Sequence, residues 1–380
     1  MTDVRKRKRN QKTVKGKIDI TFLSLVLILL TIGLVMLFSA SYAYSLEYYG
    51  SSYKFISRQA LLGGVGVIFM LLISRIDYHH WKKLSIAVYV ISLILLLIVK
   101  IAPPMVSGMS VKRWLVIGPI NFQPSEIAKF AVVLLFSSYI AGHYKEMNKF
   151  SVIGFLLILL ALPCGLIVVE PHLSATILVF CIGAVLMIVG GLPKRYIITG
   201  FIAAVGGVIA LIFGGTVGYG SDRIKYWFDP WADASGKGFQ TIQSLLAIGS
   251  GGILGRGIGQ SRQKHLWVPE PHNDFIFSIV CEELGLIGAL IIILLFCLLL
   301  WRGFTVAMHA EDKFGSLMAI GLTFQVALQA MLNIWVVTNT IPNTGISLPF
   351  FSYGGTSLFI LLCEMGIVLN ISRSANIEKT

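Results

Sequence analysis

The sequence predicts an all-α polytopic membrane protein with about ten transmembrane helices. Of its 380 residues, 56% are hydrophobic and 13% are charged, and the mean hydropathy is +0.81. This composition leaves too little polar surface for a water-soluble globule. The apolar residues gather in runs of about 20, the length that a hydrocarbon core of about 30 Å requires. The five cysteines all fall inside these runs, without a disulfide or metal-site spacing.

The apolar runs divide the chain into an ordered series of expected helices. The first run is too long, and too poor in small residues at its end, to be a removable signal peptide, so we expect it to be retained. We find no internal repeat, which predicts a basic tail (1–17), one membrane domain (18–372) and a second tail (373–380). The expected helices span residues 18–38, 56–74, 84–101, 126–142, 152–169, 174–192, 196–214, 275–301, 314–337 and 355–372.

Positive charge predicts the orientation. Lys and Arg are enriched in both tails and in loops 75–83, 143–150, 193–195 and 302–313, which the positive-inside rule places in the cytoplasm. The run Arg5-Lys6-Arg7-Lys8-Arg9 lies directly before the first helix, so it indicates an orientation signal touching anionic lipid and not a nucleic-acid site. The alternate loops then face outward, and these are 39–55, 102–125, 170–173, 215–273 and 338–354.

The fourth expected helix opens with charged residues at its outward end. Glu126 and Lys129 are three residues apart on one helix face, a spacing that favours an internal ion pair. Ser125, just before them, is a candidate N-cap. A capped helix with an ion pair is the plain structural interpretation, and the alternative is that these charges shape a functional cavity.

The long outward loop between the seventh and eighth helices, 215–273, is rich in cations and aromatic residues. It should lie at the interface as short amphipathic pieces, either holding an anionic lipid headgroup or serving only as an anchor. Its glycines lack the Gly-Lys-Ser/Thr signature, so nucleotide binding is not expected. The cations are Arg223, Lys225, Lys237, Arg256, Arg262 and Lys264.

Asp274 stands where this loop enters the eighth helix. An acid there is either a helix cap or a catalyst. At 100° per residue Asp274 and Glu282 differ by about 80°, which predicts that they face the same side of the helix. Glu282 and Glu283 lie deep in an apolar run and must find protein partners or water.

The last two expected helices carry further polar signals. Gln325, Gln329 and Asn333 follow strict i,i+4 spacing, which predicts hydrogen bonds between helices. The segment 341–356 contains two prolines and three glycines, so we expect a re-entrant or cavity-lining loop. Glu364, inside the tenth helix, is another buried acid.

Together these segments resemble the SEDS family (shape, elongation, division and sporulation) of RodA, FtsW and SpoVE, over nearly the whole chain. The Gly-Gln-Ser-Arg-Gln-Lys stretch and the Pro-Glu-Pro start are most similar to the division and sporulation branch. The motifs are Lys112-Arg113-Trp114, Gln123-Pro124-Ser125-Glu126, Gly238-Phe239-Gln240, Gln243-Ser244, Gly257-Ile258-Gly259-Gln260-Ser261-Arg262-Gln263-Lys264, Pro269-Glu270-Pro271-His272-Asn273-Asp274, Glu282-Glu283-Leu284-Gly285 and Leu348-Pro349-Phe350-Phe351-Ser352-Tyr353-Gly354-Gly355.

One motif departs from the family pattern. His172 stands where many relatives have Asp in Pro-Asp-Leu-Gly-Thr, so the role of that acid is not carried over to this chain.

The resemblance implies a bacterial peptidoglycan glycosyltransferase that polymerises lipid II at the outer face of the cytoplasmic membrane. We expect Asp274 to act as general base in an inverting transfer, without an organic cofactor and with room for a divalent cation (Mg²⁺ or Mn²⁺). Arg223, Arg262 and Lys264 are the candidates for neutralising the pyrophosphate leaving group. The substrate-binding or site-shaping candidates are Lys112, Arg113, Glu126, Lys129, Arg223, Arg262, Lys264, Glu270, His272, Glu283 and Ser352.

The resemblance also implies partners. These are a class B penicillin-binding protein, which cross-links the new strands, and other division or elongation machinery. Two other functions stay open, a lipid II flippase lined by the buried acids, and a non-catalytic division scaffold.

Overall fold

The computed structural model describes residues 16–101, 113–117, 120–170, 172–200, 202, 225–236, 238–265 and 267–375. The predicted all-helical class is confirmed. Its long helices are α2 (Ile20–Tyr49), α3 (Lys54–Ile73), α4 (His79–Ile101), α5 (Pro124–His143), α6 (Phe150–Val169), α7 (Leu173–Val189), α11 (Ile276–Met308), α12 (Lys313–Val337) and α13 (Gly355–Ser374). Smaller elements are α10 (Phe239–Gly251), the 3-10 turns η1 (Tyr144–Glu146) and η2 (Pro230–Asp233), and strands β1 (Leu115–Ile117) and β2 (Ile120–Phe122).

Within the described residues, eight helices are long and apolar enough to cross a membrane, and α7 is a shorter apolar helix. The chain is therefore a multi-pass membrane protein, as its composition predicts. The expected helix at 196–214 lies mostly outside the described residues, so the count of ten stays a prediction. The long loop 215–273 is described only in part, and it contains α10 and η2.

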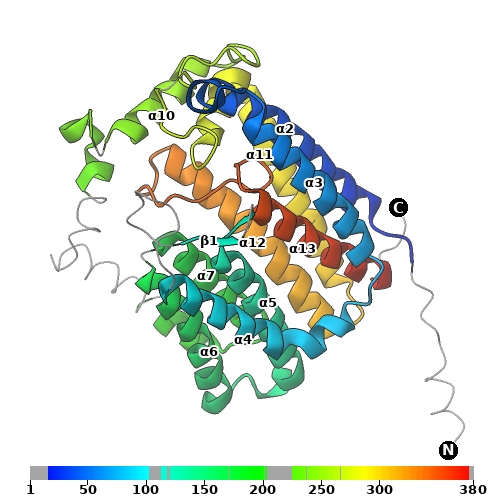
Figure 1. Cartoon of the computed structure of the whole chain (residues 1–380). Coiled ribbons are helices and arrows are strands. Elements are labelled where there is room, and N and C mark those ends of the chain that lie inside the picture. The colour runs from blue at the N-terminus through cyan, green and yellow to red at the C-terminus, as the bar shows by residue number, and fades with distance from the viewer. Residues whose placement is uncertain are drawn as a thin grey trace, which may run out of the picture.

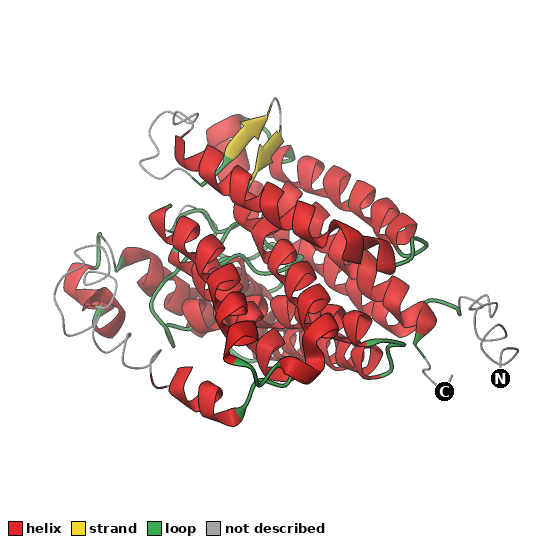
Figure 2. Ribbon diagram, turned by 90° about the horizontal axis from the view of Figure 1, so that it is seen from below, coloured by secondary structure: helices red, strands yellow, loops and turns green. Residues whose placement is uncertain are grey.

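A small antiparallel hairpin is the one departure from helix among the described elements. Leu115 pairs with Phe122, in a segment for which the sequence analysis predicts only a loop. The hairpin lies just before α5, and Figure 2 shows it at the edge of the helical bundle.

Helix α12 forms the centre of the bundle. It packs against α11, α5, α7 and α13, and it is the most deeply buried of the long helices. The pairs α13 with α3 and α4 with α5 complete the main contacts (Figure 1). A central helix needs internal partners for polar side chains, so its Gln and Asn residues face other helices and not lipid.

The two ends of the membrane domain meet. The backbone N–H of Gly16 donates to the carbonyl of Arg373 at 2.8 Å. Asp19, the N-cap of α2, accepts from Arg302 at 2.8 Å, and its own N–H donates to Ser372 at 3.1 Å. Both ends therefore lie on one side, as expected. Figure 1 shows α10 at the far end of the molecule from the C-terminal end of α13.

Helix α11 is broken at Gly285, which has φ 69° and ψ −169°. In an unbroken helix the carbonyls of residues 282 and 283 would accept from residues 286 and 287. Here segment 252–257 inserts into the break and replaces these bonds with four of its own. The bonds are Arg256 N to Glu282 O (3.0 Å), Gly257 N to Glu283 O (3.0 Å), Leu286 N to Gly252 O (2.9 Å) and Ile287 N to Ile253 O (3.2 Å).

Gly285→Ala is expected to destabilise the protein by more than the 1–3 kcal/mol or so that an unfavourable φ/ψ region costs. The reason is that a Cβ on Gly285 would lie 2.2 Å from the backbone nitrogen of Gly255, so the inserted segment must also move. Thermal unfolding in detergent measures the effect. Gly249→Ala, inside α10 with nothing within 4 Å of the added carbon, is the control and should be neutral or slightly stabilising. Equal stability of the two variants would contradict the insertion of segment 252–257 into the break of α11.

Candidate active site

A cavity of about 800 Å³ opens among the helix ends opposite the chain termini. Its lining comes from the C-terminal end of α2, the N-terminal ends of α3, α5, α7 and α13, the hairpin, and segments 270–274 and 345–354. The positive-inside rule puts the termini in the cytoplasm, so this cavity is at the outer side of the membrane. Its charged and histidine residues are Arg58, Arg113, Glu126, Lys129, His172, Glu270, His272 and Asp274.

Asp274 lines the cavity without being a helix cap. Helix α11 begins at Ile276 with Phe275 as its N-cap residue, and among the described residues the Asp274 carboxylate accepts no hydrogen bond. Its position is held through the backbone, because Asn333 donates to the Asp274 carbonyl at 2.7 Å. Gly345, with φ 68°, allows the close approach, since a Cβ there would lie 3.1 Å from Asp274 Oδ2. A carboxylate with no hydrogen-bond partner in the described part of the chain is available to a substrate.

The electrostatic surroundings favour proton transfer at Asp274. Burial raises the pKa of this carboxyl to about 6, with a further increase from Glu270 and an opposing effect of Arg113. A pKa near the working pH is what a general base needs. The prediction that Asp274 and Glu282 face the same side is wrong, because Asp274 lines the cavity and Glu282 does not. Asp274 precedes helix α11, so the 100° spacing does not apply to it.

A buried ion pair forms one wall of the cavity. Lys129 Nζ lies 2.9 Å from Glu126 Oε2, as the spacing predicts, and the Lys129 side chain is 2% exposed. Lys129 also donates to Gln329 Oε1 at 3.0 Å, and Gln329 donates to the Ser347 carbonyl at 3.1 Å. The pair thereby connects α5 to α12 and to the cavity loop. The N-cap prediction for Ser125 is wrong, because the cap residue is Gln123.

The polar stripe of α12 makes the predicted contacts between elements. Gln325 donates to Glu364 on α13 at 3.0 Å, and Asn333 donates to the carbonyls of Asp274 and Ile346 at 2.7 and 2.6 Å. Residues 345–354 contribute to the cavity lining, as the prolines and glycines of segment 341–356 predict. The central helix therefore holds both the Asp274 backbone and the facing loop in place.

Two histidines in the cavity wall are neutral. Burial lowers the pKa of His172 to about 3, assisted by Arg113 and Lys129, and burial lowers the pKa of His272 to about 4. Gln123 Nε2 lies 3.4 Å from His172 Nδ1. The His272 ring packs at 4.3 Å from the Phe55 ring centroid. At position 172, where the family resemblance led us to expect an acid, the chain thus offers an uncharged hydrogen-bonding ring.

Ser352 and Glu270 also reach the cavity. Ser352 Oγ donates to the Asn273 carbonyl at 2.7 Å and accepts from Leu348 N at 2.7 Å, which holds the loop beside the segment that carries Asp274. Glu270 is exposed and accepts from Asn273 Nδ2 at 2.8 Å. These contacts support a site-shaping part for Ser352.

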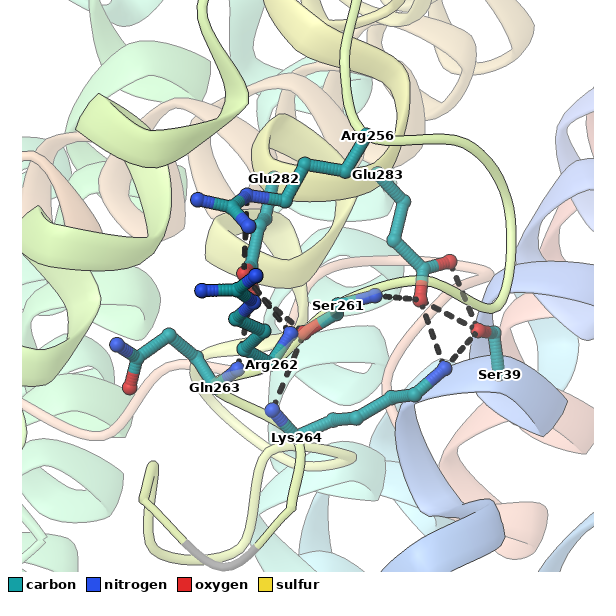
Figure 3. Close-up of polar contacts among 8 residues, drawn as sticks. All are labelled: Ser39, Arg256, Ser261, Arg262, Gln263, Lys264, Glu282 and Glu283. Carbon is teal, nitrogen blue, oxygen red and sulfur yellow. Dashed lines mark hydrogen bonds and ion pairs between the residues drawn. The ribbon is translucent and has the colours of Figure 1, made fainter.

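Three predicted site residues lie outside the cavity lining. Glu283 accepts from Ser39 Oγ at 2.7 Å and from Lys264 Nζ at 3.0 Å, and all three are buried (Figure 3). Arg262 donates its backbone N–H to Glu282 at 2.9 Å while its side chain is exposed.

We call Ser39, Arg256, Ser261, Arg262, Gln263, Lys264, Glu282 and Glu283 the loop-anchor cluster (Figure 3). Glu282 accepts from the backbone of Arg262 and from the hydroxyl of Ser261, with Arg256 at 3.7 Å. The partners expected for the two adjacent acids are therefore present, and they fasten the outer loop to α11 and α2.

The structure thus brings Asp274 together with Arg113, Glu126, Lys129, Glu270, His272 and Ser352. Lys112 and Arg223 lie outside the described residues.

The sequence analysis missed two contributors. Arg58 lines the cavity, and its charge inside the expected helix 56–74 is a signal that pointed to it. Gln59 is fully buried and donates to the Ser352 carbonyl at 3.1 Å, while its own Oε1 accepts from Gly354 N at 3.1 Å.

Metal binding by the protein alone is not indicated in the described part of the chain, which holds no group of three or more His, Cys, Asp or Glu side chains arranged for an ion. Mg²⁺ commonly uses one or two carboxylates together with substrate phosphates. The exposed Glu270 carboxylate in the cavity fits that mode.

Comparison with known proteins identifies a family. Residues 20–377 match the model of the cell cycle proteins FtsW, RodA and SpoVE. The chain is 39% identical to stage V sporulation protein E of Bacillus subtilis (strain 168), covering 95% of this chain and 98% of that protein. It is 35% identical to a probable peptidoglycan glycosyltransferase FtsW of Geobacter sp. (strain M18), covering 93% and 96%.

Solved structures agree in fold. A chain from a study of polymerization and crosslinking by a peptidoglycan synthase complex aligns with a TM-score of 0.78 and 29% identity, covering 94% of this chain and 98% of that one. The rod shape determining protein RodA of Thermus thermophilus aligns with a TM-score of 0.69 and 26% identity, covering 95% and 98%.

Proposed function

The chain belongs to the FtsW, RodA and SpoVE family of cell cycle proteins, and on that basis we propose that it is a peptidoglycan glycosyltransferase. It polymerises lipid II into glycan strands at the outer face of the bacterial cytoplasmic membrane during division or sporulation. The observation that carries this proposal is the Asp274 carboxylate, without a hydrogen bond among the described residues and facing an outward cavity of about 800 Å³.

Asp274 is the general base. It takes the proton from the 4-hydroxyl of the acceptor N-acetylglucosamine as that oxygen attacks the anomeric carbon of the donor chain. The bond from this carbon to the donor pyrophosphate breaks. The pyrophosphate takes the bonding electron pair and leaves still attached to its lipid carrier. A single in-line displacement at an α-linked carbon gives a β linkage, so the transfer is inverting.

Cations at the cavity stabilise the departing pyrophosphate. Arg113 lines the cavity close enough to Asp274 to act on its pKa, and Arg58 lines the same cavity. A divalent cation such as Mg²⁺ or Mn²⁺, held by Glu270 and phosphate oxygens, would add to this neutralisation. Lys112 and Arg223 are proposed to contribute from segments that the structure leaves undescribed.

A class B penicillin-binding protein is the proposed partner. The similar chain solved in a study of a peptidoglycan synthase complex supports this, because that complex is described as coordinating polymerization and crosslinking. The partner would receive each new strand at the outer face.

The deciding experiment supplies purified lipid II to the reconstituted protein with its penicillin-binding protein. Polymer is the expected product. Movement of lipid II across vesicles without polymer would favour a flippase instead, and neither activity from a folded, partner-bound protein would favour a scaffold.

Polymerisation is expected to depend on pH through Asp274. Because the base must be ionised and its pKa is about 6, the rate should be flat above that value and fall about tenfold for each unit below it. The measurement is the initial rate of polymer formation between pH 5 and 8 or so, with penicillin-binding protein association followed as a control. A rate that stays constant down to about pH 5 contradicts this base.

A further inference from the structure

Glu364 and Gln325 form a polar pair inside the bundle that the proposed reaction does not use. Glu364 lies in the middle of α13 and is 2% exposed, and Gln325 on α12 is 3% exposed. Gln325 Nε2 donates to Glu364 Oε2 at 3.0 Å. The remaining oxygens, Oε1 of each side chain, are buried and have no hydrogen-bond partner among the described residues.

Each of the two paired side chains therefore has one buried oxygen without a hydrogen-bond partner among the described residues. A carboxamide oxygen and an ionised carboxylate oxygen only accept hydrogen bonds, so neither satisfies the other. A buried acceptor left unpaired destabilises the fold, and the cost is larger if the acceptor is charged. A proton on Glu364 Oε1 removes both defects, because the acid O–H then donates to Gln325 Oε1 beside the bond already present.

The charge balance points the same way. Glu364 lies within electrostatic reach of Lys129 and Glu126. The charges of these two residues already compensate each other at 2.9 Å, and Lys129 donates a further hydrogen bond to Gln329. Ionised Glu364 would add one uncompensated negative charge to this set, and a buried carboxylate without a cation partner is unfavourable.

We propose that Glu364 is a positioning residue that holds a proton at neutral pH and forms a two-bond acid–amide ring with Gln325. The ring joins α13 to α12 behind the cavity, which Gln325 itself lines. It also leaves the charge of Lys129 to Glu126, so that Lys129 and Gln329 keep the Ser347 loop in place. This inference concerns the protonation of one side chain and does not depend on the proposed reaction.

Infrared spectroscopy of the purified protein at pH 7, in a detergent free of esters, tests the proton directly. The expected result is a carbonyl band of a protonated carboxylic acid in the wild type that is lost in Glu364→Gln. Because two amides form the same two-bond ring, Glu364→Gln should also keep the wild-type thermal stability, whereas Glu364→Ala should lose it.

Glu283→Gln is the matched control. Glu283 is an equally buried glutamate whose partner is the Lys264 ammonium, so its replacement should destabilise the protein without removing an acid band. Absence of the band in the wild type, as for an ionised Glu364 bridged to Gln325 by water, would overturn the proposal. A loss of stability in Glu364→Gln as large as in Glu364→Ala would overturn it as well.

Discussion

Asp274→Asn is expected to lower lipid II polymerisation by about 10²–10⁴-fold, the contribution typical of a positioned general base. Asn keeps the shape of the side chain but cannot accept the acceptor's proton. Stability should be unchanged or slightly higher, because the carboxylate accepts no hydrogen bond from the residues that the structure describes, and its ionised form is disfavoured by burial. Polymer length and yield on gels, with the same reconstituted partner, give the measurement.

Two controls separate catalysis from folding in this experiment. Thermal unfolding and binding of the penicillin-binding protein should match the wild type. Glu311→Gln removes an acid that is exposed between α11 and α12, at the opposite end of the bundle, and should leave polymerisation as it was. Near-normal polymer from Asp274→Asn would refute the base assignment.

The sequence predicted those parts of the site that depend on local spacing. The Glu126–Lys129 pair follows from i,i+3 geometry, and the contacts of Gln325, Gln329 and Asn333 follow from an i,i+4 stripe that must face protein. In both cases the side chains lie on one helix, and the helical repeat determines their relative directions. They can therefore be predicted without knowledge of the tertiary fold.

The parts that failed depend on where one helix begins or on pairs distant in sequence. The predicted common face of Asp274 and Glu282 assumes that Asp274 is part of the helix, whereas the helix starts two residues later, at Ile276. The contact of Ser39 with Lys264 joins residues 225 apart, and the insertion of segment 252–257 into the break at Gly285 follows no periodicity. The prediction that Lys264 neutralises the leaving group therefore depends only on its charge and on its position in the loop.

Lys264→Met is expected to reduce the free energy of unfolding by about 3–5 kcal/mol, the cost of leaving one partner of a buried ion pair alone. Lys264 is 2% exposed, and its Nζ lies 3.0 Å from Glu283 Oε1 and 3.2 Å from Ser39 Oγ. Chemical or thermal unfolding in detergent measures the loss. Arg262→Met, in the same loop with an exposed side chain, is the matched control and should change stability by less than about 0.5 kcal/mol.

The double variant Lys264→Met with Glu283→Gln distinguishes an anchor from a leaving-group cation. If the loop-anchor cluster is structural, removing both charges should cost less than the sum of the single changes, because no unpaired charge is left buried. A leaving-group cation predicts the reverse pattern: intact stability in Lys264→Met, and a loss of polymerisation that Glu283→Gln does not relieve. The structure favours the anchor, because Lys264 pairs with Glu283 at 3.0 Å and neither residue lines the cavity that holds Asp274.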